Sequence, residues 1–474
     1  MNRITALIFI ILGPISFAAG RAEALDLSVS QRKLSPLEFF NRCYTHLTGV
    51  HLSPSHPLRA SVVAGTIKPV DACMQVFSEA NLNSSGTVAS SKVVGNVNES
   101  YAVLRTFSDF NHTLTENPDL DNSVPESLDY RMTRLFFDEG EFGLHFTRAL
   151  FAPGAKVSDI VTLPVGLEAL RDQGSQSSVT SKVAASPFTI TMPTVQIGQF
   201  IGVRLMSANS EKSNLTKTFG GHTYQIHHSE GGGVIGTPAY LLSNFGRVME
   251  ETMNGGAKMP RRLSRAIYKD LLCRDIPVIR QSDAVQFVQS VPGPSTPPFR
   301  TASACMQCHA SIDPMAGLAR NFSFKVDYHN PDTTNSVHLY KYPVSRSAET
   351  GVVDADPDYY LRPSNGRLYF RSYDGTLIDR AVSSIADLGT AISETNDFYA
   401  CVAAKYYKFF TGITANLQDV GDPNLPALTV GDKFYRDEVI RLGQDLKSSQ
   451  NLPALIREII SSDAYQRASN HGSQ

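Results

Sequence analysis

The most constraining feature of this sequence is the pentapeptide Cys305-Met306-Gln307-Cys308-His309. Two thiols three residues apart on a forming helix can each make a thioether with a haem vinyl group, and the next residue then presents an imidazole to the iron. With six cysteines and twelve histidines in 474 residues, chance would supply only about 0.002 such motifs. The pattern therefore predicts one covalent haem c, with Cys305 and Cys308 as thioether residues and His309 as the proximal axial ligand.

Two other interpretations of the motif stay open. A zinc site would need two further ligands at a compatible spacing, and the next histidines are His329 and His338 in a polar segment. A redox-active disulfide between Cys305 and Cys308 is typical of a βαβ unit, which the sequence around 301–322 does not indicate. Haem c is favoured over both.

The first residues predict a signal peptide. A short basic start is followed by the almost wholly apolar run Ile4–Ala19, and Ala22-Glu23-Ala24 has the small-x-small pattern of a cleavage site. A retained anchor is the alternative, but Gly13 and Pro14 interrupt the run. We expect residues 1–24 to be removed and the protein to reach the periplasm or cell envelope of a Gram-negative-type bacterium. No transmembrane segment is expected after signal removal.

Composition restricts the function classes further. The chain is 42% hydrophobic and 19% charged with a net charge of -2, which is typical of a globular protein and excludes a disordered tail or a fibrous repeat. The balanced charge offers no global field to recruit nucleic acid, so no nucleic-acid partner is expected. Specificity must come from a local site.

Four further cysteines matter because an oxidising compartment favours disulfides. Cys43 and Cys73 lie on two neighbouring predicted helices, while Cys273 and Cys401 lie on predicted helices on either side of the pentapeptide. Pairing the two cysteines of each of these sets would give Cys43–Cys73 and Cys273–Cys401. The alternative is four buried free thiols, since cysteine is readily buried as a small hydrophobe.

Periodicity predicts a mainly α, multi-module protein with a small β-rich or irregular insertion. Ser35-Pro36-Leu37-Glu38 is typical of a helix start, and Gly49 of its end. Further helices are expected at 68–82, 97–115, 126–150, 260–273, 397–410, 430–447 and 451–468, with Asp397 capping its helix. The predicted modules are a signal peptide (1–24), an N-terminal helical module (25–173), the insertion (174–232), a haem-binding module (233–328), a surface insertion (329–375) and a C-terminal helical module (376–474).

The sequence around the pentapeptide resembles a known family. Residues 304–322, which continue from the motif into Ile312-Asp313-Pro314, are similar to the single-haem segment of the planctomycete-type cytochrome c-like family. The likeness extends to residues 233–242, 271–277, 374–377, 398–412 and 455–464. This resemblance implies an exported bacterial protein in which several domains of unknown function surround one haem motif.

The second axial ligand would determine the properties of such a haem, because methionine raises the reduction potential and a second histidine lowers it. Met315 is only six residues past His309, so it is disfavoured as the second axial ligand. No methionine follows Met315 in the sequence. The candidates left open are Met249, Met253, Met259, His329 and His338. Arg261, Arg262 and Arg265 could neutralise haem propionates or form a solvated helix face.

The sequence thus predicts an exported monohaem c-type cytochrome-like protein that transfers single electrons with an unidentified redox partner protein. An electron-transfer protein or redox module is favoured over a stand-alone enzyme, and no catalytic residue is assigned. The alternative is a non-catalytic envelope binding or structural protein in which haem c, or a zinc ion at the same motif, stabilises the fold.

Overall fold

The structure is a computed structural model of a mainly helical protein. It describes residues 32–81, 92–95, 97–115, 139–163, 168–172, 178–185, 188–196, 216–219, 222–226, 231–237, 240–241, 244, 260–288, 298–327, 336–341, 344–347 and 359–467. The predicted signal peptide therefore lies outside the described residues. None of the helices in these ranges is long and apolar enough to cross a membrane.

The N-terminal part is a set of helices that begin where the sequence predicts. At α1 (Pro36–Thr48), Ser35 and Glu38 form a capping box, and Gly49 ends the helix in the left-handed conformation with a φ of 69°. The other helices of this part are α2 (Pro57–Val63), α3 (Pro69–Ser78), α4 (Glu99–Thr113), α6 (Glu139–Phe151) and α7 (Asp159–Thr162). The predicted helices at 35–49, 68–82 and 97–115 are confirmed.

The remaining helices follow the middle of the chain. They are α10 (Arg261–Leu272), α11 (Gln281–Ala284), α12 (Ser303–Ala316), α13 (Ile385–Ser393), α14 (Asn396–Thr411), α15 (Val430–Ser449), α16 (Leu452–Ser461) and α17 (Asp463–Gln466). Short 3-10 helices are η3 (Gly233–Gly236), η5 (Val285–Phe287), η6 (Pro298–Thr301), η7 (Gly317–Ala319) and η8 (Tyr359–Leu361). The helices predicted at 260–273, 397–410 and 430–447 are confirmed, whereas the one predicted at 451–468 is divided at Ser462 into α16 and α17.

Strands form small antiparallel sheets. β1 (Val93–Val94) pairs with β2 (Val97–Asn98), and β10 (Gly366–Arg371) with β11 (Leu377–Val382). A three-stranded sheet has the order β3 (Glu168–Asp172), β4 (Ser178–Ala185), β5 (Phe188–Gln196). A four-stranded sheet has the order β6 (Thr216–Phe219), β7 (His222–Ile226), β9 (Ser336–Lys341), β8 (Phe322–Asp327). The segment 174–232, where a β-rich or irregular insertion is predicted, therefore contains β4 to β7.

Strand β10 differs from the surface position predicted for 329–375. Its Leu368, Tyr369 and Phe370 are fully buried, and β10 packs against α12 and α13. Three consecutive buried residues show no alternation of apolar and polar positions. A strand of this kind is therefore hard to recognise by period, and it lies under helices that come from elsewhere in the chain.

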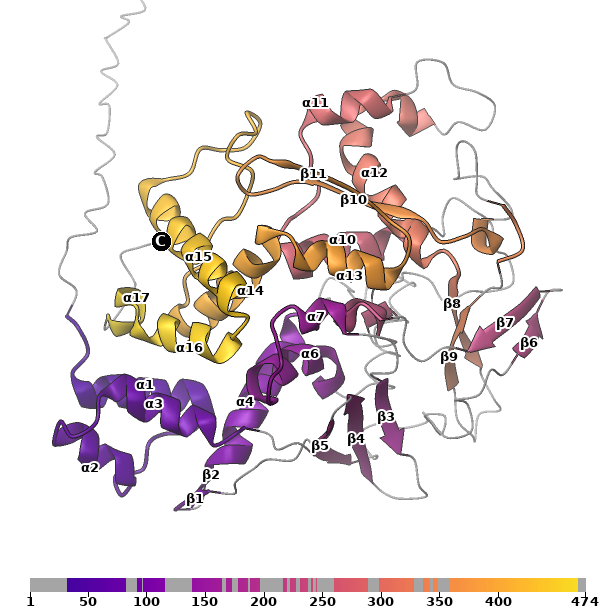
Figure 1. The fold of residues 1–474 in the computed structure, drawn as a ribbon. Coiled ribbons are helices and arrows are strands. Elements are labelled where there is room, and N and C mark those ends of the chain that lie inside the picture. Colours follow the sequence, from indigo (N-terminus) through magenta and orange to yellow (C-terminus); the bar gives the residue numbers. More distant parts are fainter. Residues whose placement is uncertain are drawn as a thin grey trace, which may run out of the picture.

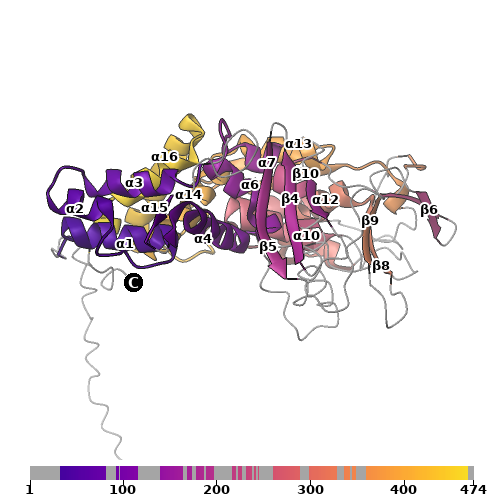
Figure 2. The same ribbon diagram turned by 90° about the horizontal axis from the view of Figure 1, so that it is seen from below.

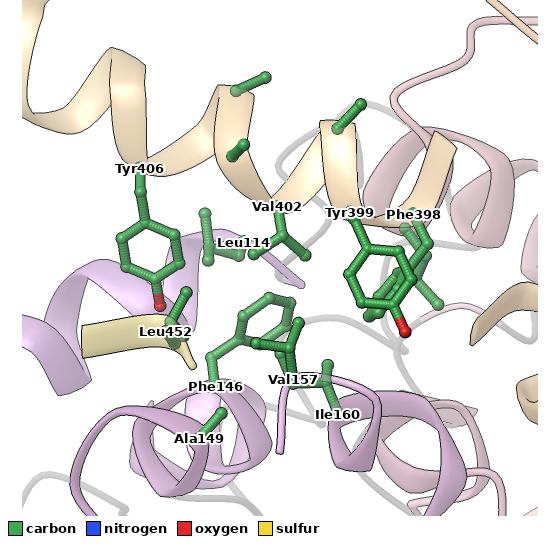
Figure 3. Close-up of a cluster of buried hydrophobic side chains, with 14 of the residues drawn as sticks. Leu114, Phe146, Ala149, Val157, Ile160, Phe398, Tyr399, Val402, Tyr406 and Leu452 are labelled. Carbon is green, nitrogen blue, oxygen red and sulfur yellow. The ribbon is translucent and has the colours of Figure 1, made fainter. Parts of the chain in front are cut away.

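Helix α14 lies at the centre of the core. Figure 3 shows Phe398, Tyr399, Val402 and Tyr406 of α14 directed at a facing group of apolar side chains. That group contains Leu114, Phe146, Ala149, Val157, Ile160 and Leu452. All ten of these side chains belong to one continuous cluster of buried residues that runs from α1 to α17. N-terminal and C-terminal helices therefore share a single core.

The N-cap of α14 corrects one sequence prediction. Thr395, not Asp397, caps the helix, because its side chain accepts a hydrogen bond from the Phe398 amide. Asp397 is instead buried and accepts hydrogen bonds from Arg274 Nη2 at 2.5 Å, Ser372 Oγ at 2.5 Å and Tyr373 N at 3.0 Å. A carboxylate near the start of a helix can cap that helix or bind donors from distant segments, and here the distant donors determine its role.

The two ends of the described chain lie side by side. Lys33 and Arg467 form an isolated antiparallel bridge, and the Leu34 amide donates to the Gln466 carbonyl at 2.9 Å. Arg42 donates to the carbonyls of Tyr465 and Arg467 at 3.1 and 2.6 Å. In Figures 1 and 2 the indigo helices α1 and α3 accordingly lie next to the yellow helix α16.

Two disulfides join Cys43 to Cys73 and Cys273 to Cys401, which are the two pairs expected from the sequence. Cys273 follows α10 and Cys401 lies on α14, so the second bridge fastens the central helix to the helix that packs against α12. These bonds indicate an oxidising, extracytoplasmic setting.

Replacing Cys273 and Cys401 together by serine is expected to lower the free energy of unfolding by about 4 kcal/mol, because this disulfide closes a long loop in the unfolded chain. Urea denaturation of the oxidised protein measures the change. Replacing Cys43 and Cys73 by serine should lower the free energy of unfolding by less, because the Cys43–Cys73 disulfide closes a much shorter loop. An unfolding free energy equal to that of the parent would contradict this prediction.

His145 on α6 should make stability depend on pH. Its side chain is buried, and burial together with nearby Arg148 lowers its pKa from 6.5 to about 3. Between pH 6.5 and pH 3 the unfolded chain therefore binds a proton at this histidine that the folded chain does not bind. The contribution to the free energy of unfolding is full above pH 6.5 and is lost as the pH falls toward 3. His145→Leu should reduce the slope of unfolding free energy against pH by about 1.4 kcal/mol per unit within this window.

Denaturation of both forms at pH 7 and pH 5 checks this, with replacement of the exposed His51 by leucine as the matched control. Identical slopes for parent and His145→Leu would contradict the expectation.

Candidate functional site

The pentapeptide lies on α12 (Ser303–Ala316), which exposes one face and buries the other. Met306, Ala310 and Met315 are buried, whereas Cys305 is exposed and Cys308 is partly exposed. The helical period places residues 306 and 310 on a different face of α12 from residues 305 and 308. The two thiols therefore lie on the open side of a helix whose other side is fixed in the core.

Two hydrogen bonds from neighbouring segments fix α12 in place. Ser264 Oγ on α10 donates to the Ile312 carbonyl at 2.9 Å, and Gln307 Nε2 donates to the Ile279 carbonyl at 2.9 Å. Gln307 stands between the two motif cysteines in sequence, and its side chain reaches the loop after α10. The motif is therefore held on a rigid support.

The two motif cysteines are the free thiols of this chain, since the other four are bridged. Burial, with a smaller contribution from Cys305, raises the pKa of the Cys308 thiol. The Cys308 thiol therefore stays protonated at neutral pH. The pair thus remains free while the other four cysteines form disulfides.

His309 is oriented by Asp313 one turn later on α12. Its Nδ1 lies 3.0 Å from Asp313 Oδ1, and since a carboxylate only accepts, Nδ1 is the protonated nitrogen. The ring lies against Phe299 of η6, with centroids 4.2 Å apart and an angle of 31° between the planes. Within the described part of the chain, Nε2 has no hydrogen bond, so its lone pair is available to a metal.

Asp313 is itself held by two arginines. Arg261 donates to both its carboxylate oxygens, at 2.6 Å from Nε and 3.2 Å from Nη2, and Arg300 Nη2 donates to Oδ2 at 3.2 Å. Burial would raise the pKa of Asp313, but the hydrogen bonds from His309 and Arg261 outweigh it and hold that pKa below its usual value. Asp313 is therefore a buried carboxylate at neutral pH.

The candidates for the second axial ligand are dispersed. Met249, Met253, Met259 and His329 lie outside the described residues. His338 lies on β9, in register with Lys325 of β8, and Met315 is buried on α12. Of the three arginines considered for propionate binding, Arg261 is bonded to Asp313 instead.

A groove of about 800 Å³ lies between α10, α14 and Gln307 of α12. Gln307 lines it together with Lys269 at the end of α10, Lys405 and Lys408 on α14, and the loop 414–425. Burial lowers the pKa of Lys405 to about 8, and its amine donates to the Leu114 carbonyl at 2.9 Å. Residues far apart in sequence form this groove, which sequence patterns therefore did not indicate.

Sequence reasoning also missed Asp313 and Phe299, which contact His309, and Arg300, which binds Asp313. The spacing of four between His309 and Asp313 on a helix is a signal that could have revealed the first, because such residues lie one above the other. Arg300 and Phe299 come from a separate 3-10 helix, for which no local pattern exists.

Comparison of the chain with protein-family models, curated proteins and solved structures finds no match. The donor set must therefore be judged on its own chemistry. Two free thiols and one imidazole nitrogen with an available lone pair fit the three attachment points of haem c. Among the described residues, no three His, Cys, Asp or Glu side chains are grouped so as to hold a metal ion.

Proposed function

We propose that this protein is an exported monohaem c-type cytochrome-like protein that transfers single electrons in the bacterial periplasm or cell envelope. The observation that carries the proposal is the arrangement on α12: free Cys305 and Cys308, followed by His309 with Nδ1 bonded to Asp313 and Nε2 available. The resemblance of residues 304–322 to the planctomycete-type cytochrome c-like family supports the same function.

Each residue has a distinct task in this proposal. Cys305 and Cys308 would hold the cofactor through thioether bonds, and His309 Nε2 would bind its iron. Haem iron, when bound, supplies one-electron chemistry by alternating between its ferric and ferrous states. Asp313 and Phe299 keep the imidazole in one orientation, so that the ligand needs no rearrangement when the charge at the iron changes.

The position of the motif favours electron transfer over a purely structural role. Cys305 is exposed, so the edge of a haem attached there would lie at the surface, where a redox partner protein can approach it. A haem that only stabilised a core would be expected on a buried helix face. The partner itself is unidentified.

Expression of the full chain together with a c-type maturation system tests the proposal. The pyridine haemochrome spectrum of the purified protein should show one covalent haem per chain. A redox titration should then give a single reversible one-electron transition. Protein that carries no covalent haem, or a haem that redox mediators neither reduce nor reoxidise, would refute the proposed function.

We further expect the haem to be low-spin and six-coordinate, with a second ligand from outside residues 301–320. Met315 is buried on the same helix as His309 and lies only six residues after it, so we do not expect it to reach the opposite face of the same porphyrin. A methionine ligand predicts a weak near-red charge-transfer band in the oxidised state, and loss of this band in Met249→Ala, Met253→Ala or Met259→Ala would identify it.

A low-spin spectrum without that band would point to His329 or His338. A high-spin, five-coordinate spectrum with ready binding of carbon monoxide would contradict the expectation of six-coordination.

A further inference from the structure

We propose that Asp313 is a positioning residue that fixes the tautomer of His309 and lowers the reduction potential of the haem attached at Cys305 and Cys308. The inference rests on the proposed function, because it concerns the ligand of an attached haem. It assigns a chemical task to a buried carboxylate that lies four residues beyond the motif.

The geometry of the pair determines the tautomer. Asp313 Oδ1 accepts from His309 Nδ1 at 3.0 Å, so the proton is held on Nδ1 and the lone pair on Nε2. Both residues lie on α12, and Phe299 covers the imidazole ring. The ring therefore has a defined plane before any cofactor is attached, as is usual for histidine ligands held by an outer carboxylate.

The same contact should alter the electron density on the ligand. The Asp313 side chain is only 5% exposed, so its negative charge is weakly screened by water and attracts the Nδ1 proton strongly. This attraction makes Nε2 a better electron donor, which stabilises ferric iron relative to ferrous iron. A lower reduction potential follows.

The two arginines act in the opposite direction. Arg261 and Arg300 donate to the same carboxylate, so they keep it in place and offset part of its charge. Arg300 lies 3.2 Å from Oδ2, the oxygen that His309 does not contact. Loss of the Arg300 cation should therefore leave the contact with His309 intact and increase its effect.

The test compares variants of the full, haem-loaded chain by redox titration. Asp313→Asn should raise the midpoint potential by about 59 mV, a tenfold change in the ratio of reduced to oxidised haem at a fixed potential. Asp313→Glu should retain more of the parent potential, and Arg300→Gln should shift it downward. The matched control is Asp283→Asn, which removes a carboxylate bonded to Arg371 at 2.6 and 2.9 Å but without contact to His309.

The outcomes separate this inference from the function on which it rests. A parent protein without covalent haem would refute the proposed function. A haem-loaded parent with unchanged potential in Asp313→Asn, or with an equal shift in Asp283→Asn, would overturn the role of Asp313 alone. Where Asp313→Asn does not fold or retain haem, Arg300→Gln decides: a downward shift supports the inference, and an unchanged or raised potential overturns it.

Discussion

Replacing Cys305 and Cys308 together by alanine is expected to abolish covalent haem attachment completely. These are the two free thiols of the chain, and they lie on the open face of α12, so no other side chain can form the thioethers. Haem-linked peroxidase staining after denaturing electrophoresis, and extraction with acidified acetone, measure the effect. Each single variant should retain at most one thioether and a reduced yield.

His309→Ala should give poor attachment and an abnormal spectrum, because the axial nitrogen is lost. The matched control for the double variant Cys305→Ala with Cys308→Ala is Cys43→Ser with Cys73→Ser, which also removes two cysteines but from a disulfide away from α12. Haem that resists extraction after both motif thiols are replaced would contradict this prediction.

Asp397→Ala should lower the free energy of unfolding by about 3–5 kcal/mol, since removing one partner of a buried ion pair leaves the other charge uncompensated. Arg274 and Asp397 have side-chain exposures of only 5% and 2%, and Ser372 and the Tyr373 amide also donate to this carboxylate. The substitution therefore leaves three donors without their acceptor. Chemical denaturation of the oxidised protein measures the loss.

The matched control is Asp445→Ala, which breaks a contact between Asp445 and Arg441 at 2.9 Å in which both side chains are about half exposed. This change should cost less than about 1 kcal/mol. The double variant Asp397→Leu with Arg274→Met should recover much of the stability, because no unpaired charge then remains. Equal stability of Asp397→Ala and the parent would show that the pair contributes nothing.

The features that could be predicted from sequence depend on short-range signals. Ser35, Glu38 and Gly49 specify both ends of α1 through contacts within a few residues, and the four bridged cysteines could be paired because they lie on separate predicted helices. The spacing of Cys305, Cys308 and His309 is also a short-range signal that can be recognised in the sequence. The module boundaries drawn from composition, and the haem itself, stay predictions.

The features that could not be predicted depend on contacts between distant segments. Asp397 looks like a helix cap in sequence, yet Arg274 from more than a hundred positions away determines its place. Strand β10 lacks an alternating pattern because helices cover it. The arginines on Asp313 come from α10 and η6, and no local pattern connects either of them to the motif.

The bridge between Lys33 and Arg467 joins two segments that lie far apart in the sequence. Helix α1 packs against α2, α3 and α4, which follow it directly, and Tyr465 of α17 adds contacts with Phe39 and His46. Closing so long a loop is entropically costly, so we expect the local packing of α1 to form early in folding and its contact with α17 to form late.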